Sequence, residues 1–496
     1  MSQIRKRSLK ATSWIYAGFL IGAINVYFLT HKDWFTPDQN GLTRAMLDVS
    51  LLICGFSTVG VTSYIIKFFP YYQDNSENKH NDLLGTALKI ALSAFVFIGL
   101  MVWLLQPLIV QKFGTNSRLL VDYILWTIPM AFSILLFNIL EAYAYNFQKG
   151  IFTSLLKECV VRLYTLVIIL LKVCDLISFH LFVILFALQY VVVVLLLAGV
   201  LYKEGNLWIH FKISPVTSKY RRKIFSILAL TSIVVIVNVL RGAIDGLLLA
   251  AKQDLAKAGI FSLASYFASV LQAPLRSLVA ITIPILSRAW KDKNHREISR
   301  IYKRSSINLL CFALFFFFCI WLNFDNGIAF FGINPAYLEG KWVFFLLGMV
   351  TIIEMGTGVN GQIIGTSNYW RFELWTSLLL TALIIPLSYF LTVRYGIFGP
   401  AIANLVSFTI YNAIRFWFLW KKFHMQPFSY KTLEILLISV GAYFVSYFCF
   451  KNLAGLTAIF CNLILFTSIF VTGMYTRNIS PDVKPVLNSL TKRFRQ

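Results

Sequence analysis

The sequence predicts an all-α polytopic membrane protein with about 14 transmembrane helices. Of its 496 residues, 58% are apolar and only 13% are charged, about half the charged share of an ordinary soluble domain. The mean hydropathy is +0.72. The apolar runs are close to the ~20 residues that cross a bilayer as a helix, whereas a membrane β-barrel shows alternating segments of about 10 residues.

The distribution of basic residues indicates how these runs cross the membrane. The formal net charge is +24, and Lys and Arg are concentrated in alternate loops, above all in Lys203–Lys223 and Arg288–Arg304. This pattern is typical of positive-inside topology and does not require nucleic-acid binding. It predicts a multi-pass membrane protein with both termini cytoplasmic. We expect spans at 10–30, 43–69, 84–105, 118–142, 152–173, 176–201, 224–250, 258–284, 305–324, 341–365, 371–391, 397–420, 430–449 and 453–475.

The spans are expected to form two related halves. An offset of 218 residues places Gly259 on Gly41 and Phe331-Gly332 on Phe113-Gly114, so the halves form a parallel repeat. We expect an N-terminal lobe at 1–202, a cytoplasmic linker at 203–223, a C-terminal lobe at 224–420, two further spans at 421–476 and a basic tail at 477–496. The tail is interpreted as an amphipathic helix on anionic membrane lipid, with a disordered basic tail as the alternative.

Two adjacent runs, 224–250 and 258–284, each carry a stripe of polar side chains. At about 100° per residue, the members of each stripe share one helix face. The first stripe consists of Thr231, Asn238, Arg241, Asp245 and Lys252, and the second of Ser262, Ser265, Ser269, Gln272 and Arg276. An arginine near the bilayer centre costs about 2.5–3.5 kcal/mol on insertion scales, so it normally faces protein or water. The stripes therefore predict a polar cavity inside a helix bundle.

Three arginines are candidates for binding a phosphate or diphosphate group, because a guanidinium stays charged and binds phosphate oxygens in pairs. They are Arg241, Arg276 and Arg44, the last near the outer end of the second span. Local pairing is the alternative, since Arg241 and Asp245, like Arg44 and Asp48, are four residues apart. Arg276 has no carboxylate on its own stripe and is the best ligand candidate.

Other charged and helix-breaking residues within the spans have two interpretations each. Glu354 lies at the centre of the tenth span, where apolar surroundings favour the protonated acid. It is either a proton carrier or the partner of an arginine on a neighbouring span. Pro274 is expected to kink the eighth span beside Arg276, as a hinge or as ordinary bundle packing. Basic residues near cytoplasmic span ends are expected to extend to the interface, namely Lys67, Lys89, Lys157 and Arg415.

The sequence contains no catalytic or cofactor-binding motif of the types GxxxxGK[ST], HExxH, GxSxG or CxxC. The seven cysteines lie in or beside apolar runs and are interpreted as core thiols. We therefore expect no enzyme activity, no cofactor and no metal.

The chain resembles the Wzx-type polysaccharide flippases of the multidrug/oligosaccharidyl-lipid/polysaccharide (MOP) exporter superfamily. The resemblance rests on segment 395–403 (YGIFGPAIA), on Phe331-Gly332, on Asn334-Pro335-Ala336-Tyr337 and on segment 365–371 (GTSNYWR). It implies a V-shaped bundle of two six-helix lobes with two extra C-terminal helices. It also implies alternating access that moves undecaprenyl-diphosphate-linked oligosaccharide repeats to the outer leaflet, for O-antigen, capsule or exopolysaccharide synthesis.

The resemblance also implies roles for the intramembrane residues. Cavity residues would hold the diphosphate, and the candidates are Arg276, Arg241, Arg44, Gln272 and Asn238. Candidates for ion coupling are Glu354, Asp245 and Asp48. The expected partners are the lipid-linked oligosaccharide, anionic membrane lipid and polysaccharide-assembly machinery, with no nucleic acid.

Three alternative functions remain. A cation-coupled multidrug exporter of the same superfamily is disfavoured by the small number of buried acids. A peptidoglycan-precursor flippase also fits fourteen spans. A membrane glycan polymerase or ligase belongs to a different class and generally needs a sizeable outer loop with catalytic groups, which this chain lacks.

Overall fold

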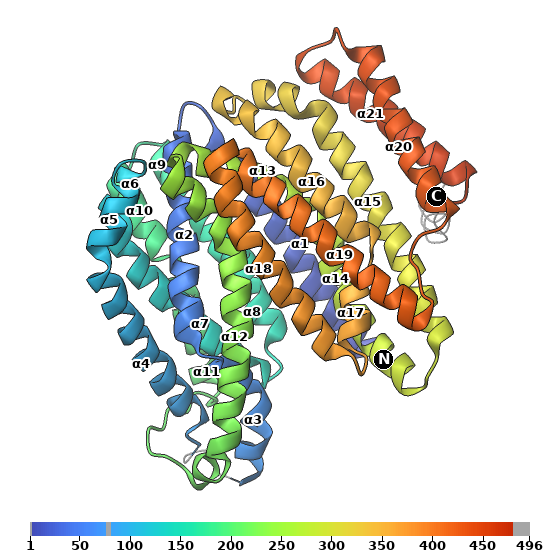
Figure 1. Cartoon of the computed structure of the whole chain (residues 1–496). Coiled ribbons are helices and arrows are strands. Elements are labelled where there is room, and N and C mark those ends of the chain that lie inside the picture. The colour runs from blue at the N-terminus through green and yellow to red at the C-terminus, as the bar shows by residue number, and fades with distance from the viewer. Residues whose placement is uncertain (1, 76–80, 480–496) are drawn as a thin grey trace. The chain divides into compact units, whose positions relative to one another are not determined.

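The structure is a computed structural model that describes residues 2–75 and 81–479 (Figure 1). Its regular elements are helices, which confirms the predicted all-α fold. The chain divides into two compact units, Met1–Gly259 and Ile260–Gln496, and each is described by itself below.

The first unit contains α1 to α12 and the start of α13. Its elements are α1 (Ser2–Thr30), α2 (Pro37–Thr58), α3 (Val61–Asn75), α4 (Leu83–Leu104), α5 (Gln106–Phe113), α6 (Arg118–Tyr123), η2 (Ile124–Trp126), α7 (Thr127–Tyr145), α8 (Gly150–Leu155), η3 (Leu156–Val160), α9 (Val161–Val173), α10 (Phe179–Ala187), α11 (Gln189–Lys203), α12 (Pro215–Lys252) and α13 (Leu255–Leu271).

The second unit begins within α13, at Ile260. Its further elements are α14 (Ala273–Lys291), α15 (His295–Phe330), η4 (Pro335–Glu339), α16 (Gly340–Gly356), α17 (Asn360–Gly365), α18 (Trp370–Tyr395), α19 (Phe398–Phe423), α20 (Tyr430–Phe450) and α21 (Gly455–Thr476).

Ten helices in the described ranges are long and apolar enough to cross a membrane, or eleven if α2 and α3 form one bent span. The predicted total of fourteen stays a prediction. Two predicted spans are interrupted. Span 43–69 bends by 41° between α2 and α3, where Val59 and Gly60 are left-handed (φ 42° and 67°). Span 258–284 consists of α13 and α14, with a break at Gln272.

Helix α2 packs against α4, α7 and α12 in the first unit (Figure 1). Its start is fixed by a capping box, in which Gln39 N donates to Thr36 Oγ1 (3.3 Å) and Thr36 N donates to Gln39 Oε1 (3.1 Å). Gly55 lies against Val239 of α12, and Gly246 of α12 lies against Asp48, so the two helices run antiparallel. Because glycine has no side chain, these positions allow a close approach that suits helix contacts in a membrane.

A second close approach joins the starts of α2 and α13. A Cβ on Gly41 would lie 2.7 Å from the carbonyl carbon of Leu255, and a Cβ on Gly259 would lie 3.0 Å from Gly41 N. Gly41 and Gly259, which the predicted repeat aligns, therefore both lie at a direct contact between the backbones of two helices. Any larger residue at either position would force α2 and α13 apart.

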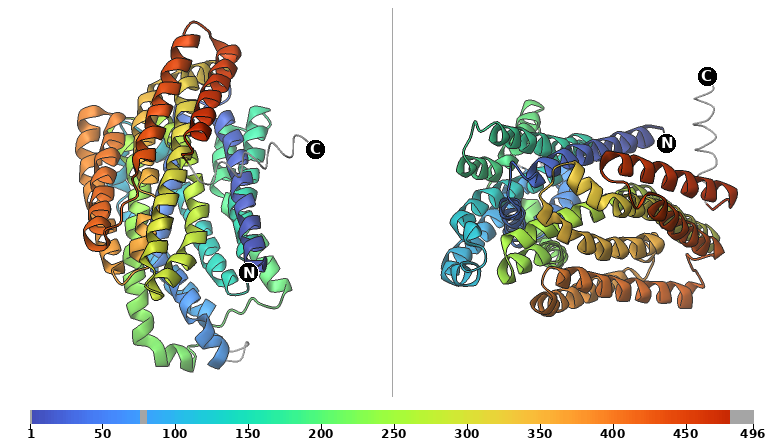
Figure 2. Two further views of the ribbon diagram at one scale, coloured as in Figure 1. Left: turned by 90° about the vertical axis from the view of Figure 1, so that its right-hand side faces the viewer. Right: turned by 90° about the horizontal axis from the view of Figure 1, so that it is seen from above.

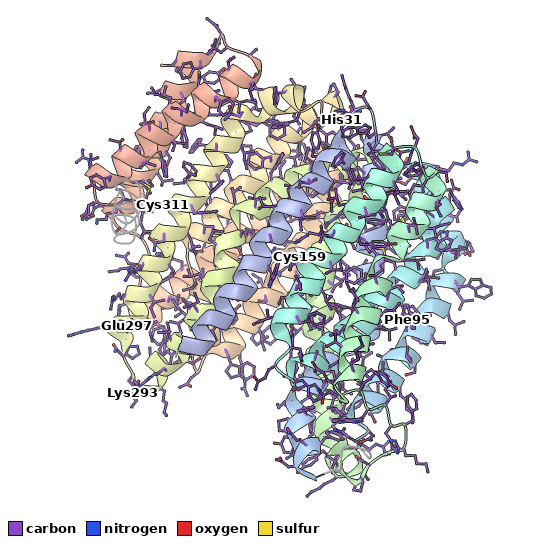
Figure 3. The ribbon with its side chains drawn as sticks, turned by 180° about the vertical axis from the view of Figure 1, so that it is seen from behind. His31, Phe95, Cys159, Lys293, Glu297 and Cys311 are labelled. Atoms are coloured by element: carbon purple, nitrogen blue, oxygen red, sulfur yellow. The ribbon has the colours of Figure 1, made fainter. Side chains whose placement is uncertain are left out.

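Long helix α15 is central to the second unit and contacts α14, α16, α20 and α21. Asn294 Oδ1 caps its start by accepting from Glu297 N (3.1 Å), at the turn labelled by Lys293 and Glu297 in Figure 3. Aromatic rings of α15 pack on α21, for example Phe315 against Phe470 (centroids 5.4 Å apart). Figure 2 shows α20 and α21 lying side by side. These two helices correspond to the predicted spans 430–449 and 453–475.

The predicted lobe boundaries at 202 and 224 stay a prediction. By packing, α12 belongs to the first unit, because it lies against α2 and α3. Of the predicted amphipathic tail at 477–496, residues 480–496 lie outside the described residues.

Candidate functional site

The first polar group lies where α2 meets α12 in the first unit. Arg44 Nε donates to Asp48 Oδ2 over 3.0 Å, so the i,i+4 pairing given as the alternative is present. The Asp48 side chain is only 2% exposed, whereas that of Arg44 is 40% exposed. The ion pair with Asp48 involves the Nε atom of Arg44, and much of the Arg44 side chain stays accessible. The pairing and phosphate-binding interpretations of Arg44 are therefore compatible.

Asp48 is held against α12 as well as beside Arg44. Gly246 supplies the space, since a Cβ there would stand 2.6 Å from Asp48 Oδ2. Asp245, which precedes Gly246 on α12, is near enough for its carboxylate to repel that of Asp48. Two of the predicted ion-coupling acids thus lie together, with Arg44 as the compensating cation.

Arg241 and Asn238 form the second polar group of this unit, about one turn away along α12. Arg241 Nη2 donates to Asn238 Oδ1 over 3.2 Å. Asn238 is exposed and Arg241 is partly exposed, although both lie within an apolar run. Polar groups at membrane depth are stable only beside water, protein or a polar ligand. The two residues that the sequence suggested as ligands therefore act as one hydrogen-bonded pair.

The second unit contains a polar contact that joins two separate predictions. Gln272 Nε2 donates to Glu354 Oε2 over 3.0 Å. Gln272 is the residue at which α13 ends and α14 begins, and Pro274 follows in the first turn of α14. The break at Gln272, beside the kink that was expected at Pro274, thus brings an amide donor to the carboxyl group at the end of α16. Because an amide can donate to either form of the acid, this contact is compatible with protonation and deprotonation of Glu354.

Polar contacts continue from Glu354 toward α19. Thr357 Oγ1 lies 2.9 Å from the Glu354 carbonyl oxygen and 2.9 Å from Asn412 Oδ1. Asn360 Nδ2 also donates to Asn412 Oδ1, over 3.1 Å. Thr357, Asn360 and Asn412 are all buried. They form a connected set of hydrogen bonds inside the second unit, which low surrounding polarity strengthens.

One turn beyond Asn412, Arg415 corrects a prediction. It was expected to extend to the interface, but it is only 5% exposed. Its guanidinium pairs with Glu373 of α18, its Nε donates to Thr376 Oγ1 (3.3 Å), and its charge lies 3.8 Å from the centre of the Tyr411 ring. A carboxylate and an aromatic face replace the water that a surface arginine would use.

The ion pair between Arg415 and Glu373 was missed because its partners are 42 residues apart and lie on different helices. The one available signal was Glu373 itself, a lone acid in the first turn of an apolar span. Arg276, the best ligand candidate, lies in the first turn of α14 and is exposed.

The structure therefore groups the predicted residues within each unit. Arg44, Asp48 and Asp245 gather at α2 and α12, Asn238 and Arg241 pair on α12, and Gln272 and Glu354 pair across a helix break. In the described part of the chain, no three His, Cys, Asp or Glu side chains gather as a metal site. The groups that are present suit binding of a phosphate by guanidinium and exchange of a proton or cation by carboxyl groups.

The fold is similar to that of solved membrane transporters, one of which is described as a member of the MOP superfamily. The chain is similar to a lipid II flippase MurJ in an inward closed conformation, with 15% identity over 95% of this chain and 99% of that chain (TM-score 0.73). It is also similar to an inward-facing MATE family multidrug transporter of that superfamily (13% identity, 84% and 98% covered, TM-score 0.64). A third similar structure is the Vibrio cholerae MATE transporter VcmN in its bent form (15% identity, 85% and 98% covered, TM-score 0.51).

No family model matches the sequence, and no curated protein matches it significantly. At these identities the likeness concerns the fold.

Proposed function

We propose that this protein is a secondary transporter that flips a lipid-linked oligosaccharide across the bacterial inner membrane by alternating access. The observation that carries the proposal is the combination of a flippase-like fold with arginines inside the membrane-spanning segments. The fold match with the lipid II flippase extends over 95% of the chain. The proposed cargo is an undecaprenyl-diphosphate-linked repeat for O-antigen, capsule or exopolysaccharide.

The diphosphate would be bound by guanidinium groups. Arg44 and Arg241 are both partly exposed within the apolar helices α2 and α12, and Asn238 lies beside Arg241. Arg276 and Gln272 would act from the start of α14. A diphosphate offers several oxygens to such donors, and each charge-assisted hydrogen bond is about twice as strong as a neutral one.

The proposed ion-coupling groups are Glu354, Asp48 and Asp245. Of these, Glu354 accepts a hydrogen bond from the Gln272 amide. A proton or cation bound there would change the charge at the break between α13 and α14. Such a charge change at a helix break is a physical means of biasing one conformation over another.

Two other cargoes have specific support. A peptidoglycan precursor is favoured by the printed description of the lipid II flippase that the chain resembles in fold. A cationic drug is favoured by the MATE structures and by the Asp48 and Asp245 pair. Enzyme activity is not part of the proposal, and a membrane glycan polymerase or ligase remains the less favoured class.

The proposal also covers the membrane topology, the division into lobes and the protein partners. Both termini are proposed to be cytoplasmic, with lobes at 1–202 and 224–420 joined by a cytoplasmic linker, and with the basic tail on anionic lipid. Polysaccharide-assembly proteins are proposed partners.

Deletion of the gene in its source strain tests the proposed cargo. We expect loss of surface polysaccharide and accumulation of lipid-linked repeats on the cytoplasmic side of the membrane. Unchanged polysaccharide without accumulation would contradict the proposal. Arrested peptidoglycan synthesis with accumulated lipid II would instead assign the precursor cargo, and loss of cationic-dye efflux alone would assign the drug-exporter alternative.

A further inference from the structure

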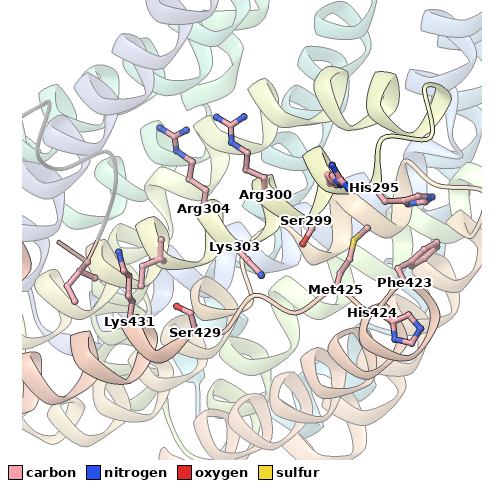
Figure 4. A pocket seen from close by; sticks show the side chains of 13 residues that line it. His295, Ser299, Arg300, Lys303, Arg304, Phe423, His424, Met425, Ser429 and Lys431 are labelled. Carbon is pink, nitrogen blue, oxygen red and sulfur yellow. The ribbon is translucent and has the colours of Figure 1, made fainter. Parts of the chain in front are cut away.

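A second basic region lies in the second unit, and its lining includes none of the residues proposed above as ligands. A cavity of about 780 Å³ opens beside the start of α15. Figure 4 shows its lining, which comes from α15, from the end of α19 and the loop after it, and from the first turn of α20. Ile479, beyond the end of α21, also lines it. Five of its side chains are permanently basic: Arg296, Arg300, Lys303, Arg304 and Lys431.

Nothing of opposite charge lines this cavity among the described residues. Arg300 makes an ion pair with Glu297 outside the lining, yet its side chain stays 65% exposed. Lys431 donates to the backbone carbonyl of Asn478 over 2.6 Å, and this contact brings no negative charge to the ammonium group. Like charges held together repel one another, so a bound anion would stabilise this arrangement.

The cavity is amphipathic rather than purely charged. Ile307, Phe423, Met425 and Ile479 contribute apolar surface to its wall. A soluble anion gains nothing from such a wall, whereas a lipid headgroup carries glycerol and acyl carbons next to its phosphate. The mixture of cations and apolar side chains therefore fits a phosphate that is attached to a lipid.

The position of the cavity at the ends of the apolar runs favours a lipid ligand. Lys303 and Arg304 immediately precede the apolar run 305–324, and Lys431 stands at the start of the run 430–449. The helices that contain these runs, His295–Phe330 and Tyr430–Phe450, both qualify as membrane spans. The cations thus lie at the water–bilayer boundary, where phospholipid phosphates are found.

We propose that this cavity binds the phosphodiester headgroup of an anionic phospholipid from the surrounding leaflet, which its basic residues predict to be cytoplasmic. The phosphate is bound from two helices, by Arg300, Lys303 and Arg304 on α15 and by Lys431 on α20. The bound lipid therefore links the α20–α21 pair to α15 at a point where their cations repel. The proposal does not depend on which cargo the protein transports.

Native mass spectrometry of the purified full-length protein tests this site, with phosphatidylglycerol as the probe and phosphatidylcholine as the uncharged reference. We expect one phosphatidylglycerol to be retained preferentially. The variant Arg300→Gln/Lys303→Gln/Lys431→Gln should bind it roughly a hundredfold more weakly, since each basic group near the surface contributes about a factor of five. The single variant Lys431→Gln should bind about fivefold more weakly and covers the case in which the triple variant fails to fold.

The control variant is Arg288→Gln/Lys291→Gln/Lys293→Gln, which removes the same charge from nearby side chains that do not line the cavity. It should retain phosphatidylglycerol like the wild type. Equal loss in control and cavity variants, or no loss in either, would overturn the proposal. Inorganic diphosphate that displaces the phospholipid at similar concentration would assign a soluble anion instead. Retention of undecaprenyl diphosphate without any retention of phosphatidylglycerol would assign the cavity to the cargo.

Discussion

Gln272 and Glu354 meet at a helix break, with the Gln272 amide donating to the Glu354 carboxyl group over 3.0 Å. The amide stands at the joint between α13 and α14, and the acid stands near the end of α16. Any change in the charge of Glu354 therefore changes its hydrogen bond with Gln272, at the joint between α13 and α14. If Glu354 binds a proton or cation as proposed, this contact carries the change in charge to the joint between the two helices.

The first prediction concerns this contact. Glu354→Gln should abolish the pH dependence of transport, because an amide cannot exchange a proton with water in the physiological range. Gln272→Ala should leave a pH dependence but lower stability by about 1 kcal/mol, since it removes one hydrogen-bond donor from the acid. Transport by reconstituted vesicles as a function of pH, together with thermal unfolding in detergent, measures both. A Glu354→Gln variant whose transport keeps the wild-type pH profile would rule out the coupling role.

The second prediction uses two glycines of α12. Gly246→Ala places a methyl group 2.6 Å from Asp48 Oδ2 and should cost about 1–3 kcal/mol by displacing the carboxylate from Arg44. Gly242→Ala is the matched control, because nothing lies within 4 Å of its added methyl group. That control should be neutral or stabilising by about 0.5–1 kcal/mol, the usual effect of this change inside a helix. The measurement is the thermal unfolding temperature of each variant. Equal unfolding temperatures for Gly246→Ala and Gly242→Ala would refute the close packing of Asp48 on α12.

The third prediction concerns the buried ion pair of the second unit. Arg415→Ala should destabilise the protein by about 3 kcal/mol, because Glu373 loses its cation while its surroundings remain largely apolar. The double variant Arg415→Met/Glu373→Gln should recover much of that loss, since no charge is then left unpaired. Arg394→Ala, at the exposed end of α18, is expected to have no effect. If Arg415→Ala unfolds at the wild-type temperature, Arg415 is a surface residue as the sequence suggested.

The fourth prediction tests the proposed topology with a natural cysteine. Cys174 is exposed and follows the fifth predicted span, so it should face the outside of the cell. In a Cys449→Ser background, a membrane-impermeant maleimide should label Cys174 in intact cells, while the buried Cys54, Cys159 and Cys311 stay unlabelled (Figure 3 places Cys159 and Cys311). An added cysteine at Ser218, at the cytoplasmic end of α12, should react only after the cells are opened. The reverse pattern would invert the proposed topology.

Hydrophobic run length was sufficient to predict the all-helical fold and most helix positions, because the bilayer sets the length of a spanning helix. It could not predict that 258–284 breaks at Gln272, since Pro274 allows either a break or a continuous kinked helix. Helical spacing predicted the contact of Arg44 with Asp48, which lies on one helix face. Spacing carries no information about partners on different helices. The Gln272 contact with Glu354 and the pair formed by Arg415 and Glu373 therefore became visible only in the structure.

The roles of the arginines in binding a diphosphate are the central claim, and one measurement addresses it most directly. Arg241→Ala and Arg276→Ala are introduced into the deletion strain, and the lipid-linked repeats on each side of the membrane are quantified. Both variants should reduce delivery to the outer leaflet at least tenfold while their amount in the membrane stays normal, since each removes a charge-assisted contact to the phosphate. Arg118→Ala, an exposed arginine at the start of α6, should transport normally. Full delivery by both Arg241→Ala and Arg276→Ala would contradict the account.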